Sequence, residues 1–134
     1  MTLNDTLKGL VDTVDGALGC AVVDVSSGLM LGVYHTVPYF TQSYVDAVAA
    51  AAVEMFRGNT VRAVEKLLAT QRGDSEVNYI KEVQMTTDNT LHFMCIVPNK
   101  PNALVVLITN KQANLGMGWA ALRRSLDEVA PHCP

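Results

Sequence analysis

The sequence predicts an α+β domain in which helices cover both faces of one five-stranded antiparallel sheet, a three-layer sandwich. Helical and strand patterns follow one another in the order α-β-β-α-β-β-β-α along 134 residues, a length that suits a single domain, 1–134. The links between successive strands are short and rich in turn-forming residues, which favours antiparallel hairpins. The strand patterns at 91–97 and 103–109 are apolar on both faces. Both faces of the sheet therefore need cover.

Residues 2–15 predict the first helix, because aliphatic side chains recur in it every three or four positions. Thr2 and Asp5 have the spacing of a capping box at its start. Segments 18–25 and 29–35 then have the pattern of strands, joined by a tight turn of two serines and a glycine. This arrangement predicts a hairpin.

A second helix is predicted to begin near Ser43, which has capping-box spacing with Asp46, and to run to about residue 70. Gly58 can kink or divide it, since glycine costs about 1 kcal/mol in a helix interior. Its first part, YVDAVAAAAVEMF (44–56), has Asp46 and Glu54 as its only charges, about 80° apart on the helical wheel. A helix that is apolar nearly all round is covered on more than one side. A second surface is therefore expected to pack on this helix.

Three more strands are predicted at 76–85, 91–97 and 103–109, followed by a last helix at 113–130. The first of these strands is the most polar, so we expect it at an edge of the sheet. An exposed edge strand is a template for pairing with another chain. An edge strand and a helix with spare apolar surface together suit a symmetric dimer. We therefore expect a second copy of the chain to cover 44–56.

The composition argues against several classes of function. The net charge is −3 and the basic residues are scattered, whereas nucleic-acid binding needs a basic stripe with interleaved aromatic side chains. The apolar runs fall far short of the roughly 18 residues that a membrane span needs, and the amino terminus lacks the pattern of a signal peptide. We expect a cytoplasmic protein with no membrane span. Charged residues are 17%, against about 25% in a typical soluble domain, which favours self-association.

Residues that could carry chemistry are few and scattered. The candidates are His35, His92, His132, Cys20, Cys95, Cys133 and Asp24. The histidines belong to no hydrolase or metalloprotease motif, and the odd, widely spaced cysteines disfavour a disulfide framework or a zinc site. Asp24 is expected to cap a turn, and the Gly116–Gly118 pair to let the last helix approach the sheet. We expect no enzyme site, no cofactor and no metal.

Two stretches resemble the roadblock / dynein light chain domains. ANLGMGWAALRRSLDEV (113–129) is similar to the terminal segment of that family, in which an AN-L-G entry leads into the last helix and a paired basic element follows. GCAVVDVSSGLMLG (19–32) is similar to the first hairpin of the family. The order of elements matches along the whole chain. The chain thus resembles a bacterial-type member.

The resemblance implies a profilin-like fold, with the second helix on one face of the sheet and the first and last helices on the other. It also implies homodimers or heterodimers, in which the third strands pair across a two-fold axis beside the paired second helices. Members are non-enzymatic adaptors that scaffold dynein intermediate chains or nutrient-signalling complexes, or in bacteria bind Ras-like GTPases and sometimes stimulate GTP hydrolysis. Two stretches near the expected partner surface, 35–44 and 57–76, depart from the family pattern.

These observations favour a homodimeric regulatory or scaffold protein that docks a small Ras-like GTPase, or another signalling or motor partner, through its paired second helices. The predicted contacts are Tyr44, Ala47, Ala51 and Met55 on the helix, with Tyr79 and Ile80 in the strand pairing. The alternative for each is a place in the core, which we prefer for Val48, Ala52 and Phe56.

Two other functions stay open. A small-molecule sensor needs an internal pocket of roughly 300 Å³ or more with a few polar groups, for which Asp24, His35 and His92 are the candidates. An activator of GTP hydrolysis needs an arginine finger, worth about 10³–10⁵ in rate. The arginines that flank the expected partner region are Arg57, Arg62 and Arg72. Nothing in the sequence selects one of them.

Overall fold

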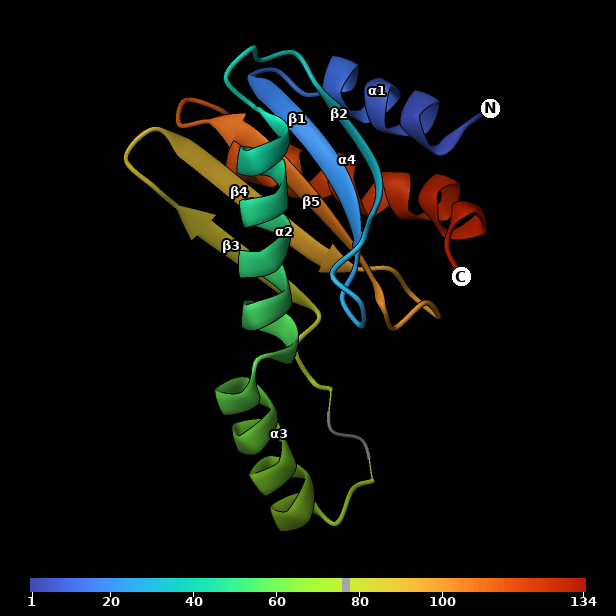
Figure 1. Cartoon of the computed structure of the whole chain (residues 1–134), viewed down its shortest axis with the longest axis vertical. Helices are drawn as coiled ribbons and strands as arrows, with labels where there is room; N and C mark the ends of the chain where they lie inside the picture. The colour runs from blue at the N-terminus through green and yellow to red at the C-terminus, as the bar shows by residue number, and fades with distance from the viewer. Residues whose placement is uncertain (76–77) are drawn as a thin grey trace.

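A computed structural model describes residues 1–75 and 78–134 and, within them, places five strands in one antiparallel sheet (Figure 1). The strands are β1 (Ala17–Asp24), β2 (Met30–His35), β3 (Glu82–Thr86), β4 (Thr90–Ile96) and β5 (Ala103–Asn110). Their order across the sheet is β2-β1-β5-β4-β3, so β2 and β3 are its two edges. The predicted fold class is confirmed.

Among the described residues, three of the four α-helices begin at a residue whose side chain caps the helix. The helices are α1 (Leu3–Thr13), α2 (Gln42–Arg57), α3 (Asn59–Arg72) and α4 (Leu115–Val129), and a 3-10 turn follows at Ala130–His132. The predicted capping box of α1 is present, because Thr2 Oγ1 accepts the Asp5 N–H at 3.1 Å and Asp5 Oδ2 accepts the Thr2 N–H at 3.0 Å.

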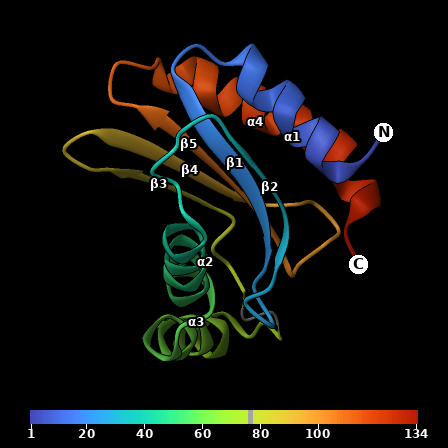
Figure 2. The ribbon, with the colours of Figure 1, turned by 45° about the horizontal axis from the view of Figure 1, so that its top comes forward.

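Helices cover both faces of the sheet, which gives three layers (Figure 2). α1 and α4 pack on one face, where Leu7 and Leu122 are fully buried. α2 packs on the other, where Phe56 and Met94 lie in a second core. β4 and β5 are buried on both faces, as their continuous apolar sequence requires. This is the layering that the family resemblance implied.

The predicted second helix is in fact two helices, divided at Gly58. This residue ends α2 and precedes α3 with an extended backbone, φ −63° and ψ 156°. A Cβ atom at Gly58 would collide with the backbone carbonyl of Glu54, so the sharp break needs glycine. Figure 1 shows the result: α3 continues past the end of α2 and lies outside the area of the sheet.

The predicted capping box at Ser43 and Asp46 is wrong. The N-cap of α2 is Thr41, whose Oγ1 accepts the Tyr44 N–H at 3.2 Å. Ser43 therefore lies inside the first turn, and Asp46 instead accepts a hydrogen bond from Gln42 Nε2 at 2.8 Å. Another cap-forming residue stands only two positions earlier, and it takes the role.

The predicted strand at 76–85 is wrong in its first half. β3 begins at Glu82, residues 78–81 form a connecting segment, and 76–77 lie outside the described residues. The N–H groups of Tyr79 and Ile80 donate to the Glu65 carboxylate on α3, which keeps this segment out of the sheet. The expectation that this strand forms an edge is confirmed.

α4 approaches the sheet closely at Gly118, as predicted. A Cβ atom there would lie 2.6 Å from Cζ of Phe93 on β4. The adjacent Trp119 ring packs edge-on against Phe93, with ring centres 5.4 Å apart. The glycine thus lets an aromatic pair join helix and sheet.

The two edges of the sheet differ. At the β2 edge, the Val33 N–H donates to Asn4 Oδ1 of α1 at 3.2 Å. The Leu3 and Asn4 side chains also lie so close to Gly32 that a Cβ atom there would be within 3 Å of both. At the β3 edge, every residue except the half-buried Val83 is exposed. Only the β2 edge is closed by a helix of the same chain among the described residues.

Candidate protein-binding surface

α2 presents three faces, because successive residues are about 100° apart around the helix. The face toward the sheet consists of Val45, Ala49, Ala52 and Phe56, all buried. The polar face consists of Ser43, Asp46, Ala50 and Glu54, all exposed. Between them lie Tyr44, Ala47, Ala51 and Met55, which we call the α2 stripe. The prediction that Ala52 and Phe56 face the sheet is confirmed, while Val48 is half-buried at the border of the stripe.

The α2 stripe brings together the four residues that the sequence predicted on this helix. Ala47 and Ala51 are exposed, and Tyr44 and Met55 are half-buried against the core of this face. The Tyr44 ring stacks on Phe40 with centres 4.7 Å apart, and burial raises the pKa of its hydroxyl. The alanine methyl groups permit close approach of another backbone, and the flexible Met55 side chain can adapt to it.

Tyr79 and Ile80, predicted in the strand pairing, lie before β3 rather than in it. The Tyr79 N–H donates to Glu65 Oε2 at 2.5 Å and the Ile80 N–H donates to the same oxygen at 3.2 Å. The Tyr79 hydroxyl donates to Asp74 Oδ2 at 3.2 Å, while the Ile80 side chain packs toward the α2 core. Tyr79 therefore lies against α3, while Ile80 packs on the same core as Met55 of the α2 stripe.

The sequence analysis missed Glu65, which is only 3% exposed. One of its oxygens caps the two amides, and the other, Oε1, is buried with no hydrogen-bond partner within the described part of the chain. A sequence signal exists: Glu65 lies one turn after Val61 and one turn before the buried Ala69. Buried carboxylates are rare unless they have a structural task. Here the task is to tie α3 to the segment that enters β3.

β3 is held on the sheet by an ion pair with α4. Arg123 donates from Nε and Nη2 to the two carboxylate oxygens of Glu82, at 2.9 and 2.7 Å. This bidentate contact lowers the pKa of Glu82, and the guanidinium also lies 4.9 Å from the centre of the Trp119 ring. On the opposite face of β3, Val83 and Met85 point to the α2 side. The edge strand is thus fixed in place with an apolar side beside the α2 stripe.

α3 exposes an apolar surface that the sequence analysis did not single out. Val64, Leu67 and Leu68 are 53%, 65% and 39% exposed, at helical spacing, and we call them the α3 stripe. The buried residues of this helix are Glu65 and Ala69, on a neighbouring side. The signal in the sequence is an apolar pattern that resumes after Gly58 in an otherwise polar helix.

The loop before α2, one of the two departures from the family pattern, carries an aromatic cluster. Tyr39 packs edge-on against Phe40 with centres 5.4 Å apart, and Phe40 stacks on Tyr44. His35 lies 5.6 Å from Phe40, and its Nδ1 accepts the Val37 N–H. Tyr39 is 67% exposed. The cluster therefore extends the apolar surface from the start of α2 into solvent.

The three candidate arginines have different surroundings. Arg57 donates to the backbone carbonyls of Phe56 and Pro101, and burial lowers its pKa. Arg72 lies 5.6 Å from the centre of the Tyr79 ring. Arg62 is exposed on α3, and the described structure gives its guanidinium no hydrogen bond. Arg62 is thus the least constrained of the three.

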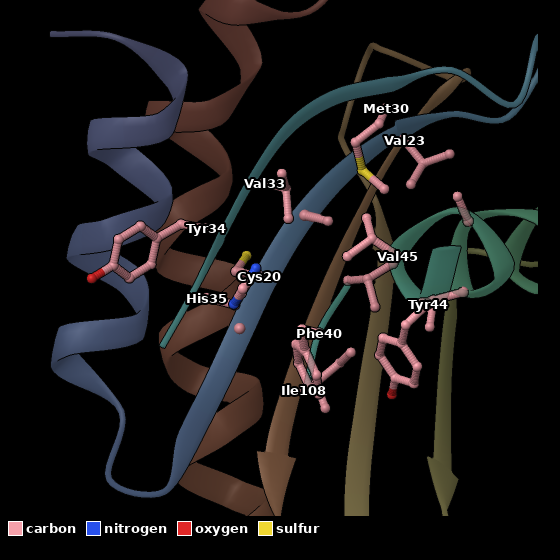
Figure 3. Close-up of a pocket in the computed structure, with 15 residues that line it drawn as sticks. Cys20, Val23, Met30, Val33, Tyr34, His35, Phe40, Tyr44, Val45 and Ile108 are labelled. Atoms are coloured by element: carbon pink, nitrogen blue, oxygen red, sulfur yellow. The ribbon is translucent and has the colours of Figure 1, made fainter. Parts of the chain in front are cut away.

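A hollow between α2 and the β1–β2 hairpin has a volume of about 30 Å³ and an almost wholly apolar lining (Figure 3). Figure 3 shows Phe40, Tyr44 and Ile108 at one end and Met30 and Val23 at the other. Its volume is close to that of one water molecule and far below the roughly 300 Å³ of a small-molecule site.

Asp24 and the cysteines, which the sequence analysis considered as candidates for chemistry, are held in the structure by turn or core contacts. Asp24 Oδ1 accepts hydrogen bonds from the N–H and hydroxyl of Ser26, which cap the turn as predicted and lower the pKa of Asp24. All three cysteines are free and buried, and burial raises the pKa of Cys20 to about 12.

Among the described residues, no cluster of three or more His, Cys, Asp or Glu side chains could hold a metal ion. In the same residues, no helix is long and apolar enough to cross a membrane.

Comparison with known proteins places this arrangement among solved folds. No protein-family model matches the chain, and no curated protein matches it significantly. A Roadblock/LC7 domain from Streptomyces avermitilis superposes with a TM-score of 0.70 at 17% identity, over 98% of each chain. The gliding protein MglB from Thermus thermophilus gives 0.72 at 17% identity, over 98% of this chain and 87% of MglB. An MglB with a tetrameric arrangement gives 0.75 at 18% identity, with the same coverage.

Identities this low establish the fold and leave the function to be argued from the surface. The layers, the strand order and nearly full coverage agree with the resemblance drawn from 19–32 and 113–129. The chain has the fold of the Roadblock/LC7 domains.

Proposed function

We propose that this protein is a homodimeric, non-enzymatic regulatory or scaffold subunit of the cytoplasm that docks a small Ras-like GTPase or another signalling or motor protein. The observation that carries the proposal is the α2 stripe beside the β3 edge. The α2 stripe is an apolar surface and the β3 edge is a row of backbone groups open to pairing, and the described chain covers neither of them. They adjoin one another, because Val83 of β3 packs on the same core as Tyr44 and Met55. Surfaces of this kind suit contact with another protein.

The proposed dimer follows from the geometry of an edge strand. If β3 of two copies pairs antiparallel, one continuous sheet results and the two-fold axis is perpendicular to it. The two α2 helices then lie on the same face and run antiparallel, in contact along their α2 stripes near Ala51. Tyr79 and Ile80, at the entry to β3, would flank this contact. The tetrameric arrangement of one MglB structure supports self-association in this fold.

The partner class comes from the family resemblance, in which bacterial members bind Ras-like GTPases. The paired α2 helices and the loops beside them would form the docking surface. Arg62, exposed beside this region, is the first arginine to test for an effect on hydrolysis. The polar groups predicted for a small-molecule sensor do not converge on one hollow. His35 lines the hollow of about 30 Å³, while Asp24, His35 and His92 are all absent from the lining of a larger hollow of about 480 Å³ beside Asn110 and Arg124. This dispersal does not favour the sensor.

The test is a pull-down from the host's own lysate with the tagged chain, in the presence of GDP or a non-hydrolysable GTP analogue. We expect a small GTPase to be retained in one nucleotide state and not in the other. Hydrolysis assays with Arg62→Ala, and with Lys66→Ala as a matched exposed cation on the same helix, would then ask whether the protein also stimulates turnover. Retention of no GTPase in either state would refute the GTPase part of the proposal.

A further inference from the structure

The α3 stripe is an apolar surface that no other part of the described chain covers. Leu67 is 65% exposed and Val64 is 53% exposed, although each lies within one turn of the buried Glu65 or Ala69. Figure 1 shows why: α3 projects past the end of α2, away from the sheet that would otherwise bury these side chains. Three large aliphatic side chains aligned on one helix indicate a contact surface.

We propose that the α3 stripe packs on a second copy of the chain, against the loop 36–41 and the first turn of α2 of that copy. α3 is then an arm that each protomer lays on the other. This inference rests on the proposed homodimer and names a further part of its interface.

The antiparallel arrangement of the two α2 helices leads to this contact. With the two-fold axis near Ala51, Met55 of one copy lies opposite Ala47 of the other, since each is four residues from Ala51. Continuing outward, Val64 is 13 residues after Ala51, and Tyr39 is 12 residues before it. Because α3 continues in the general direction of α2 after Gly58, it reaches the loop that precedes α2 in the other copy.

The receiving surface has matching chemistry. Tyr39 is 67% exposed, and its ring packs on Phe40, which is itself stacked on Tyr44. Tyrosine provides a large apolar ring with a hydroxyl that can remain in water, and it is enriched at protein interfaces. Leu67 and Val64 would thus meet an aromatic surface that is already ordered.

The contact also supplies area that the rest of the interface lacks. A stable interface buries about 800 Å² on each partner and depends on a few large side chains. The exposed members of the α2 stripe are alanines, each with a single methyl group, and β3 has only five residues. The arm and its receiving loop contribute the large apolar side chains.

The distribution of charge agrees with a second copy as the occupant. α3 carries Arg62, Lys66 and Arg72 against Glu65, a net charge of +2, while the whole chain carries −3. The remainder is therefore −5, and a basic arm is attracted to the acidic body of another copy. An anionic membrane would attract α3 as well, but three apolar side chains provide little anchoring in lipid. The experiment distinguishes the two.

The first test is cross-linking between two differently tagged variants, Tyr39→Cys and Leu67→Cys, mixed and treated with a short bis-maleimide. We expect a product that contains both tags, because the two sulfurs lie on different copies across the contact. The native cysteines are all buried and give a low background, which the unmodified chain measures. Thr13→Cys, exposed on α1 at the other face of the sheet, replaces Tyr39→Cys in the matched control and should give no such product.

The second test compares Leu67→Glu with Lys66→Gln by sedimentation, since Lys66 is exposed on the same helix at least 100° around it from each residue of the α3 stripe. Both substitutions change the net charge by −1. We expect Leu67→Glu to weaken the dimer at least 10-fold and Lys66→Gln to change it less than 2-fold. If Leu67→Glu dimerises like the wild type and the Tyr39→Cys and Leu67→Cys variants give no cross-linked product, the proposed arm is refuted. The proposed dimer through α2 is then unaffected. Loss of binding to anionic vesicles by Leu67→Glu, with dimerisation unchanged, would assign α3 to a membrane instead. A wild-type chain that stays monomeric would overturn both the arm and the proposed dimer.

Discussion

Glu65 shows how far one side chain can change the course of the backbone. Its carboxylate accepts hydrogen bonds from the backbone N–H groups of Tyr79 and Ile80. For this reason β3 begins at Glu82 rather than at the predicted residue 76. The strand pattern from 76 to 85 is genuine, but a hydrogen bond from a distant helix outweighs it. Local patterns cannot contain this information, because the partner lies 14 residues away along the chain. Residues whose role is local, such as Thr2 and Asp24, were predicted correctly.

His92 makes stability depend on pH. It is 7% exposed on the α2 side of β4, with Thr90 Oγ1 3.0 Å from its Nε2, and burial lowers its pKa below the ordinary value of 6.5. Since the unfolded chain binds this proton more readily, the free energy of unfolding should fall as the pH drops below about 6.5. This contribution is complete above that pH and is lost as the pH falls toward the lower pKa of the folded state.

We expect His92→Gln to reduce the difference in the free energy of unfolding between pH 7.5 and pH 5, as measured by urea denaturation. His132→Gln, at an exposed position in the last turn, is the control and should keep the wild-type difference. An undiminished pH dependence in His92→Gln would show that another group carries it.

At the scale of elements, the sequence predicts best where packing and periodicity agree. α4, β4 and β5 have strong apolar patterns, and their observed bounds lie within two residues of the predicted ones. α2 begins at a different cap than predicted because two cap-forming residues, Thr41 and Ser43, stand close together. At Gly58 the sequence allows either a kink in one helix or a break into two, and the structure has the break. The choice depends on contacts of α3 with the segment at 78–80, which the helix pattern does not encode.

Gly118 offers a test of the close contact between α4 and the sheet. In Gly118→Ala the new methyl group would be forced into the Phe93 ring, 2.6 Å from Cζ. We expect the free energy of unfolding to fall by about 1–3 kcal/mol despite the better helix propensity of alanine. The control is Gly9→Ala in α1, where the new Cβ would meet no atom within 4 Å apart from its chain neighbours and the backbone of its own helix. It should stabilise the protein by about 0.5–1 kcal/mol. Stabilisation by both substitutions would contradict a rigid contact at Gly118.

At the scale of the whole molecule, the sequence predicts the fold and leads to a proposed partner surface on α2, but it does not identify the partner. The excess of apolar surface on α2 is visible in its composition, so the need for cover could be inferred without coordinates. The exposure of the α3 stripe and of the aromatic loop could not be inferred from the sequence, because it depends on the direction in which α3 leaves Gly58. Identity of the partner depends on side chains of another protein, which this sequence does not contain.

The placement of the two-fold axis can be tested with two neighbouring alanines. Ala51 belongs to the α2 stripe and Ala50 to the polar face, and both are exposed. We expect Ala51→Glu to fold normally by circular dichroism but to weaken the dimer at least about 100-fold, because it places two carboxylates in a closed contact. Ala50→Glu should retain the dimer mass in light scattering. A folded Ala51→Glu that keeps this mass would move the contact to another surface.

The hydrogen bond from Val33 to Asn4 has a consequence for how many copies can join. A sheet with two open edges adds chains without limit, and the product is a fibre. Here α1 lies along the β2 edge, and Asn4 accepts the N–H of Val33, so β3 is the edge that stays open. In the proposed dimer, in which two copies pair through β3, both outer edges of the joined sheet would be β2 strands with α1 beside them. Growth by strand addition would therefore stop at two copies, and the small side-chain amide near the amino terminus would help to prevent polymerisation.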